Sequence, residues 1–300
     1  MPVPELPEVE ALAGFLRERA VGSVVAAVEV AAVSVLKTHD PPPSALAGQE
    51  LTGVVRRGTW LDLDVSGLHL CVHMARAGWL RWSESLPAAA ARPGRGVVAL
   101  RVRLDDGAVD ERLAAQGRLP GFDLTEAGPR KELAVHVARD PRQVPAIAAL
   151  GPDPLDPAFD VEALAALLTG SRQQVEGLLR DQTALAGVGD ACSDEVLHAA
   201  RLSPFALAGR LGAEEVQRLW TALREVLPAA VAASAGRPAA ELEDAQRAGM
   251  RVHGRTGEPC PACGDVVREV SFADRSLQYC ATCQTGGVPL ADRRTSRFLR

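Results

Sequence analysis

Two pairs of cysteines near the end of the chain constrain its fold more than any other feature. Cys260 and Cys263 form one Cys-x-x-Cys pair, and Cys280 and Cys283 form a second after sixteen intervening residues. This is the spacing of a four-thiolate zinc site, because each pair can face one tetrahedral ion and thiolates are soft ligands. Two disulfides, or four unrelated cysteines, are the alternative interpretations. The intervening residues suffice for a short hairpin, so the sequence predicts a C-terminal finger around one structural Zn²⁺.

Composition narrows the class of protein. The chain has 300 residues, 24% of them charged, and a net charge of −5, which is ordinary for a globular protein of two or three domains. It contains no apolar run near the roughly 18 residues of a membrane-spanning helix and no signal-peptide pattern. We therefore expect a protein of the cytoplasm, where thiols stay reduced. Lysine occurs only at Lys37 and Lys131, and together with abundant Ala, Gly and Pro this suggests a high-GC bacterial genome. Cys71 and Cys192 lie in apolar stretches and are expected to be buried packing residues.

Hydrophobic periodicity divides the chain near residue 150. Apolar residues recur at helical spacing from Pro4 to Val21, which predicts an amphipathic helix, and short alternating runs then predict strands up to about residue 137. After the turn-rich stretch 150–155 the spacing becomes helical again, and helices are expected at residues 161–168, 174–179, 191–200 and 214–233. The segment 235–245 is polar and alanine-rich and is expected to be a hinge. The fold class predicted from these patterns is α+β and multi-domain, with an N-terminal β-sandwich that has a leading helix.

Three further stretches are distinctive in combination: Pro4-Glu-Leu-Pro-Glu-Val-Glu10, then Leu185-Ala-Gly-Val-Gly-Asp190, and the finger entered by Val252-His-Gly-Arg-Thr-Gly-Glu-Pro-Cys260. Together they resemble the bacterial formamidopyrimidine-DNA glycosylase / endonuclease VIII family. The resemblance implies a β-sandwich catalytic domain at 1–149 and a helix–two-turn–helix domain at 150–245. A four-cysteine zinc finger at 246–284 and a basic tail at 285–300 complete the expected division. The resemblance also implies that the partner of this protein is damaged double-stranded DNA.

The resemblance implies catalytic residues at the start of the chain. In the family an N-terminal proline attacks the sugar C1′ and forms a Schiff base, and a neighbouring glutamate transfers protons. Carried over, these residues are Pro4 and Glu5, with Glu8 in support; an ordinary helix start is the alternative. As the chain is written, loss of the initiator methionine exposes Pro2, and Pro4 is then an amide that cannot attack. If a GUG codon for Val3 is the true start, Pro4 becomes N-terminal, which the intact mass of the native protein tests.

The same resemblance implies DNA-binding residues. The Gly187-Val-Gly189 turn is expected to present backbone N–H groups to a phosphate at a helix start, or else to serve only as a cap. Asp190 stands where the family has asparagine; it is a good N-cap, but its charge weakens a phosphate contact unless an arginine compensates. Arg275 matches a hairpin arginine that reaches the phosphates beside a lesion. Arg76 stands where the family inserts a methionine into the base stack, and arginine can also fill that gap.

Other positions depart from the family pattern. Thr59 occupies the place of a hairpin lysine that contacts phosphate and assists catalysis, and Lys37 is either its replacement in space or an ordinary surface lysine. The family's arginine-bearing loop has only Arg130 and Lys131 as stand-ins, and the loop that caps a damaged base has no counterpart at 241–249. The tail at 285–300 is arginine-rich, which predicts either a solvated tail or a DNA contact.

Three functions are compatible with the sequence. The leading hypothesis is a monomeric DNA glycosylase of base-excision repair, with abasic-site lyase activity, that extrudes a damaged base from the duplex. The second is a catalytically impaired paralogue that binds damaged or abasic DNA without cleaving it, which Thr59, Asp190 and the offset of Pro4 favour. The third is a zinc-stabilised interaction module without nucleic acid, which fits the net charge of −5 but leaves the motifs unexplained.

Overall fold

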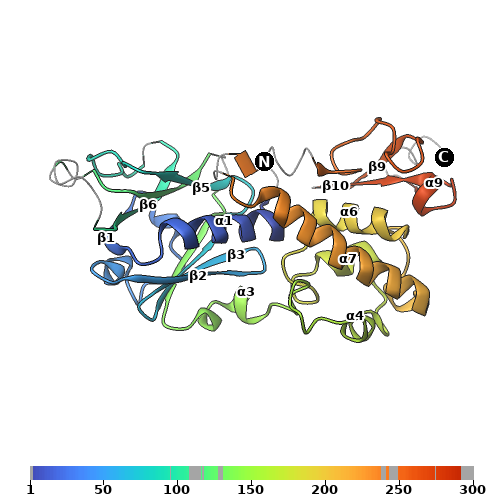
Figure 1. Cartoon of the computed structure of the whole chain (residues 1–300), viewed down its shortest axis with the longest axis horizontal. Helices are drawn as coiled ribbons and strands as arrows, with labels where there is room; N and C mark the ends of the chain where they lie inside the picture. The colour runs from blue at the N-terminus through green and yellow to red at the C-terminus, as the bar shows by residue number, and fades with distance from the viewer. Residues whose placement is uncertain are drawn as a thin grey trace. The chain divides into compact units, whose positions relative to one another are not determined.

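A computed structural model describes residues 3–94, 96–107, 116, 118–127, 131–237, 241–242, 249–273 and 275–291. Its contacts divide the chain into two compact units, whose elements are drawn in Figure 1. Unit 1 holds residues 1–4, 8–149 and 235–242, and unit 2 holds residues 5–7, 150–234 and 243–300. The division into four segments predicted above is finer than these two units and stays a prediction. Within the described ranges, no helix combines the length and the apolar character that a bilayer crossing requires.

Unit 1 is built on two antiparallel sheets of four strands each, with strand orders β1-β6-β7-β5 and β2-β3-β4-β8. The strands are β1 Val24–Val30, β2 Leu51–Arg57, β3 Trp60–Val65, β4 Leu68–His73, β5 Gly78–Ser83, β6 Val98–Asp105, β7 Gly121–Glu126 and β8 Ala134–Ala138. The helical segments around them are α1 Leu6–Arg19, η1 Val33–Val35, η2 Pro43–Leu46, η3 Pro141–Gln143 and α3 Pro145–Ala148.

Alternation along the strands places the core of unit 1. Leu61 pairs with Val72 and Leu63 with Leu70 across β3 and β4, and all four side chains are buried in one core. In Figure 1 helix α1 runs alongside both sheets, and its residues share the core with them. The expectation of a simple amphipathic helix was too narrow, because residues 8–9 and 11–13 of α1, which belong to unit 1, are all buried. A helix packed against two sheets buries more than one face.

Unit 2 combines helices with one hairpin. Its elements are α4 Val161–Leu168, α5 Val175–Arg180, α6 Asp190–Ala200, η4 Ala208–Arg210, α7 Ala213–Ser234, β9 Val267–Ser271, β10 Ser276–Cys280 and α9 Ala281–Gln284. Each of the four helices expected from periodicity in this half is present, with ends that differ by one residue at most. The predicted fold class is confirmed: an N-terminal β-sandwich with a leading helix, a helical domain and a C-terminal zinc-binding hairpin.

Helix α6 is the centre of unit 2. Nearly all of its residues are buried, including Asp194, Glu195 and His198. It packs against α7 and against strand β10 of the hairpin, which lies next to it in Figure 1. Buried polar side chains are rare unless they have partners, so the polar residues of α6 indicate where this unit is held together and where its functional groups are positioned.

Candidate functional site

Glu5 lies at the start of helix α6, although the two are far apart in the sequence. Its carboxylate accepts three backbone hydrogen bonds, from the amides of Gly189 at 3.0 Å, Ala191 at 2.8 Å and Cys192 at 2.9 Å. The first amides of a helix have no partner within it, and the N-terminus carries partial positive charge, so a carboxylate there is stabilised. Glu5 is only 5% exposed. The residue predicted to transfer protons is therefore fixed by α6.

Two glycines permit this close approach. A Cβ atom on Gly189 would lie 2.5 Å from the Glu5 carboxylate carbon, and Gly187 has a φ of +87°, which favours glycine. Gln182 fixes the turn, since its side chain accepts from the Gly187 amide at 2.7 Å and donates to the Val188 carbonyl at 2.7 Å. The amides of both glycines thus donate to groups within the protein: that of Gly187 to Gln182, and that of Gly189 to Glu5, which is the anion at this helix start. A phosphate contact by the turn stays a prediction.

The other predicted catalytic residues belong to unit 1. Glu8 lies in the first turn of α1 and is 5% exposed, and Pro4 is also buried. Pro2 lies outside the described residues. A proline nitrogen inside a peptide bond has no lone pair available for attack, so Pro4 acts as a nucleophile only in a chain that begins with it. The catalytic roles of Pro2, Pro4, Glu5 and Glu8 stay predictions.

Arg76 lies at the exposed tip of the turn between β4 and β5. This turn is tight: the Gly78 amide donates to the Met74 carbonyl at 3.0 Å, and a Cβ atom on Gly78 would lie 2.1 Å from that oxygen. Ala75 adopts a φ of +52°, in the left-handed region. The turn presents Arg76 to solvent, as a side chain that enters a base stack requires. The insertion itself stays a prediction.

A ring cluster lies beside Thr59, which is 9% exposed in the β2–β3 turn. The ring of Trp60, the next residue, has its centroid 4.9 Å from that of His73 and 5.6 Å from that of His136. Burial lowers the pKa of His73, and burial together with the charge of Lys37 lowers the pKa of His136. The charge of Lys37 therefore affects the titration of His136, whose ring contacts Trp60, the neighbour of Thr59. The role of Lys37 as a replacement for the family's lysine stays a prediction.

Two of the predicted DNA-binding residues of unit 2, Asp190 and Arg275, each form an ion pair with another side chain. Arg180 Nε lies 2.6 Å from the carboxylate of Asp190, so an arginine does compensate that charge. Arg275 pairs with Glu176 through both terminal nitrogens, at 2.6 Å from Nη1 to Oε1 and 3.2 Å from Nη2 to Oε2. The Arg275 guanidinium also lies over the Phe272 ring, 4.1 Å from its centroid. A phosphate contact by Arg275 stays a prediction.

The four finger cysteines come together around the β9–β10 hairpin. Their sulfur atoms all lie within 4.8 Å of one another, with Cys263 and Cys280 3.3 Å apart and Cys260 and Cys283 3.9 Å apart. Zn–S bonds of about 2.3 Å in a tetrahedron separate sulfur atoms by about 3.8 Å, so the cluster fits one zinc ion. Both sulfur–sulfur separations exceed an S–S bond of about 2.05 Å, so the structure favours the metal site over two disulfides. Four thiolates complete a tetrahedron, so the zinc is structural.

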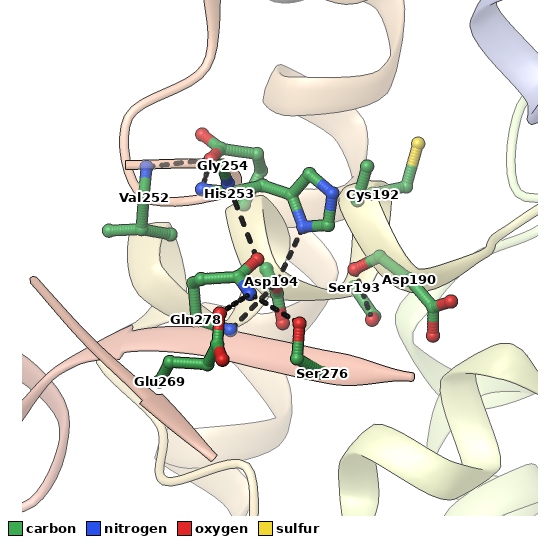
Figure 2. Close-up of polar contacts among 12 residues, drawn as sticks. Asp190, Cys192, Ser193, Asp194, Val252, His253, Gly254, Glu269, Ser276 and Gln278 are labelled. Atoms are coloured by element: carbon green, nitrogen blue, oxygen red, sulfur yellow. Dashed lines mark hydrogen bonds and ion pairs between the residues drawn. The ribbon is translucent and has the colours of Figure 1, made fainter. Parts of the chain in front are cut away.

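Helix α6 anchors the segment that enters the finger. The Glu195 carboxylate accepts from the backbone amides of residues 251–253, at 2.8, 2.8 and 2.9 Å. The Asp194 carboxylate accepts a hydrogen bond from the His253 ring at 2.8 Å and one from the backbone amide of Gln278, in β10, at 2.9 Å, as Figure 2 shows. The Gln278 side chain continues the network toward Glu269 and Ser276 of the hairpin (Figure 2). Two adjacent carboxylates of α6 therefore bind both the entry segment and the hairpin.

His198, one turn further along α6, reaches the metal centre. Its Nε2 lies 3.2 Å from Cys260 Sγ, and the ring is buried. A ring N–H that donates to a ligating sulfur orients the ligand and spreads its charge, as partners of metal ligands commonly do. On the other side of the hairpin, Leu277 and Tyr279 pack with Phe205. The zinc centre therefore has a small core of its own, around Cys260 and Cys280, and is tied to the helical part of unit 2 through His198.

Asp194 and His253, which are hydrogen-bonded to each other, both have a raised pKa. Asp194 is 1% exposed, and burial raises the pKa of its carboxyl to about 7, against the opposing effect of His253. Burial lowers the pKa of His253, but the hydrogen bond and charge of Asp194 outweigh this effect, so the pKa of His253 is raised overall. Both shifts favour retention of a proton by the pair near neutral pH.

Several residues of this site were not predicted from the sequence. Glu176 and Arg180 are four positions apart, a spacing that signals a helical ion pair, but nothing in that spacing indicates that Glu176 is buried or reaches the hairpin. His253 lies within the motif that enters the finger and His198 lies outside the quoted motifs, and no ligand spacing marks either residue. Arg130 and the arginines of the tail lie outside the described residues, as does most of the 241–249 segment.

Three family profiles match the chain in order. The formamidopyrimidine-DNA glycosylase N-terminal domain matches residues 3–116, the H2TH domain of the same enzymes matches residues 150–239, and the zinc finger found in FPG and IleRS matches residues 257–286. The last range contains all four zinc ligands proposed above. Together with the cysteine cluster, this match supports one structural zinc ion.

One similar protein matches half of the chain, and another matches most of it. An uncharacterised formamidopyrimidine-DNA glycosylase-like protein of Mycobacterium tuberculosis is 55% identical over 152 residues, which are 51% of this chain and 95% of that protein. The formamidopyrimidine-DNA glycosylase of Moorella thermoacetica is 35% identical over 276 residues, covering 89% of this chain and 94% of its own length.

Solved structures share the fold. The crystal structure of the MutM (Fpg) protein of Thermus thermophilus has a TM-score of 0.76 and 31% identity, over 95% of this chain and 100% of that one. A Lactococcus lactis formamidopyrimidine-DNA glycosylase, solved non-covalently bound to DNA with an AP site, has a TM-score of 0.77 and 24% identity, over 94% and 99% of the two chains. From these matches and the zinc centre we conclude that this chain belongs to the formamidopyrimidine-DNA glycosylase family.

Proposed function

We propose that this chain is a DNA glycosylase of base-excision repair that binds damaged double-stranded DNA, extrudes the damaged nucleotide and removes its base. The observation that carries the proposal is the Glu5 carboxylate, which follows Pro4 in the chain and accepts three amides at the start of α6. Relatives named as DNA glycosylases, and one solved with AP-site DNA, support it. We further propose a monomer of the cytoplasm that associates with the nucleoid when bound to DNA.

The chemistry would begin at a free proline amine. The Pro4 nitrogen donates its lone pair to the sugar C1′ while the base leaves with the electron pair of the glycosidic bond. Loss of the amine proton and opening of the sugar ring then give a Schiff base, from which elimination cleaves the strand. Protons must move to the departing base and to the ring oxygen, and Glu5, with Glu8 in support, is the carboxylate proposed for these transfers.

A second candidate function is DNA binding without cleavage. Specific observations favour it: Thr59 stands in place of the family's lysine, Pro4 is an amide in the chain as written, and Arg275 is engaged by Glu176. A protein of this kind would recognise damaged or abasic sites and leave the sugar intact. The two functions share the DNA-binding residues and differ in whether a free amine is present to attack the sugar.

Borohydride trapping separates the two functions. The native protein, with its N-terminus verified by intact mass, is incubated with duplexes that contain an abasic site or an oxidised base, and borohydride reduces any Schiff base to a stable adduct. We expect an adduct that disappears in Pro4→Gly. Loss of the adduct in Pro2→Gly instead would assign the amine to the chain as written.

Two outcomes would count against the glycosylase. Tight binding of the abasic duplex with no adduct and no base release would favour the binding function. Absence of binding to either duplex at low salt would reject both functions and favour an interaction module without nucleic acid. Arg19→Gln, an exposed change on α1 outside the proposed site, serves as the matched control and should trap as the parent does.

A further inference from the structure

A row of four alternating charges crosses the region proposed to bind DNA phosphates in unit 2. Asp190 pairs with Arg180 at 2.6 Å, Arg180 pairs with Glu176 at 3.2 Å, and Glu176 pairs with Arg275 at 2.6 Å. The row has no net charge. A site for a phosphate anion is normally positive, so this arrangement requires an explanation beyond the family resemblance.

Glu176 is the buried member of the row. Its side chain is 3% exposed, whereas the side chains of Arg275 and Arg180 are 18% and 25% exposed. Its two oxygens accept both terminal nitrogens of Arg275, in the bidentate geometry that a phosphate would also use. A backbone phosphate and the Glu176 carboxylate therefore compete for the same donors.

Release of Arg275 would not leave Glu176 without a partner. Arg180 Nη1 lies 3.2 Å from Glu176 Oε1, so the carboxylate keeps one cation when the other turns toward DNA. This matters because an unpaired buried carboxylate is strongly destabilising. Arg180 in turn stays near Asp190, which is 36% exposed and open to water. The row can thus exchange one ion pair without exposing a lone buried charge.

We propose that Glu176 sets the DNA specificity of this chain by competing with backbone phosphates for Arg275; the inference rests on the proposed function. An undamaged duplex, whose phosphates are held at regular spacing, gains too little from Arg275 to displace the carboxylate. A duplex distorted around a lesion can bring a phosphate into the bidentate position and displace it. Glu176 thus lowers affinity for ordinary DNA more than affinity for abasic DNA.

The test compares salt-dependent binding of the parent and of Glu176→Gln to undamaged and abasic-site duplexes. Glutamine is close in size and removes the charge. We expect E176Q to bind undamaged duplex about tenfold more tightly and to steepen the slope of log K against log salt by about 0.9, the value for one additional phosphate contact. Affinity for the abasic duplex should rise less, so the specificity ratio falls. Glu214→Gln, which removes an exposed charge on α7, should change neither slope nor ratio.

A second substitution makes the inference refutable even if E176Q does not fold, which zinc content and circular dichroism reveal. Arg275→Gln in the parent should weaken binding of undamaged duplex by less than about threefold, because Glu176 already occupies the arginine. In the E176Q background the same change should cost about tenfold. A large loss in the parent, or equal losses in both backgrounds, would overturn the inference.

Failure of the inference and failure of the proposed function give different results. If the parent binds the abasic duplex and E176Q leaves slope and ratio unchanged, or weakens binding while folded, Glu176 is a structural residue and the inference is wrong. If neither the parent nor E176Q binds any duplex at low salt, the proposed function fails and the inference fails with it. If E176Q bound duplex DNA and the parent did not, the result would support the inference.

Discussion

Replacement of Glu5 should destabilise unit 2 even in the absence of DNA. The Glu5 carboxylate accepts amide hydrogen bonds at 2.8, 2.9 and 3.0 Å from the first turn of α6. Glu5→Ala would remove the carboxylate that accepts from these amides, at a site where the Glu5 side chain is 5% exposed. The loss is therefore structural as well as catalytic.

The expected magnitude follows from the number of bonds. Each hydrogen bond to a charged acceptor contributes about 1.5 kcal/mol net at the low end of its range, which gives about 4.5 kcal/mol for three. Water that enters the space left by the side chain restores part of this, so we expect Glu5→Ala to lower the free energy of unfolding by about 3 kcal/mol. Glu5→Gln keeps one oxygen acceptor and should cost about 1.5 kcal/mol.

Urea unfolding measured by circular dichroism, with hydrogen exchange of the peptide that contains residues 186–200, provides the assay. The amides of Gly189, Ala191 and Cys192 should lose protection in Glu5→Ala before the rest of α6 does. Glu214→Gln removes an exposed acidic side chain from the first turn of α7 and should cost less than about 0.5 kcal/mol. If Glu5→Ala unfolded at the parent's urea concentration with the same protection, the capping argument would be refuted. Loss of trapping in a Glu5 variant is interpretable only beside this measurement.

Three further predictions concern the finger and its anchor. Removal of zinc by a chelator, or Cys263→Ser, should loosen residues 252–284 while leaving unit 1 folded. Metal content and hydrogen exchange measure this, and unchanged exchange after complete removal of the metal would contradict a structural role for zinc. His198→Phe should speed zinc loss to a chromogenic chelator by about tenfold, because it removes the 3.2 Å contact to Cys260, and Arg201→Gln should not. Asp194 has a pKa of about 7 in the folded state, above its value in the unfolded state, so the folded state binds the extra proton. The free energy of unfolding should therefore fall as pH rises from about 4 to about 7, by at most about 1.4 kcal/mol per pH unit. Asp194→Asn should flatten that slope in urea titrations at stepped pH, and a slope equal to the parent's would show that another group is responsible.

Much of the fold could be predicted from local pattern. The helices of unit 2 were expected to within a residue of their observed ends because apolar residues repeat at helical spacing on one core-facing side. The strands around Leu61 and Leu70 were predicted because they alternate in and out of a single core. Helix α1 shows the limit of this reasoning: its pattern resembles a one-sided helix, but contact with two sheets buries it on further faces.

The sequence by itself determined the zinc ligands and the family, because ligand spacing and short motifs are local features that need no tertiary contact to be recognised. Tertiary structure alone decided what the charged residues do. Glu5 accepts from amides of α6 that lie 184 to 187 positions away in the chain, and Glu176 binds Arg275 across 99 positions. Charges at such separations carry no pattern in the sequence, since their partners are chosen by burial: a carboxylate that loses water must find donors wherever the fold brings them.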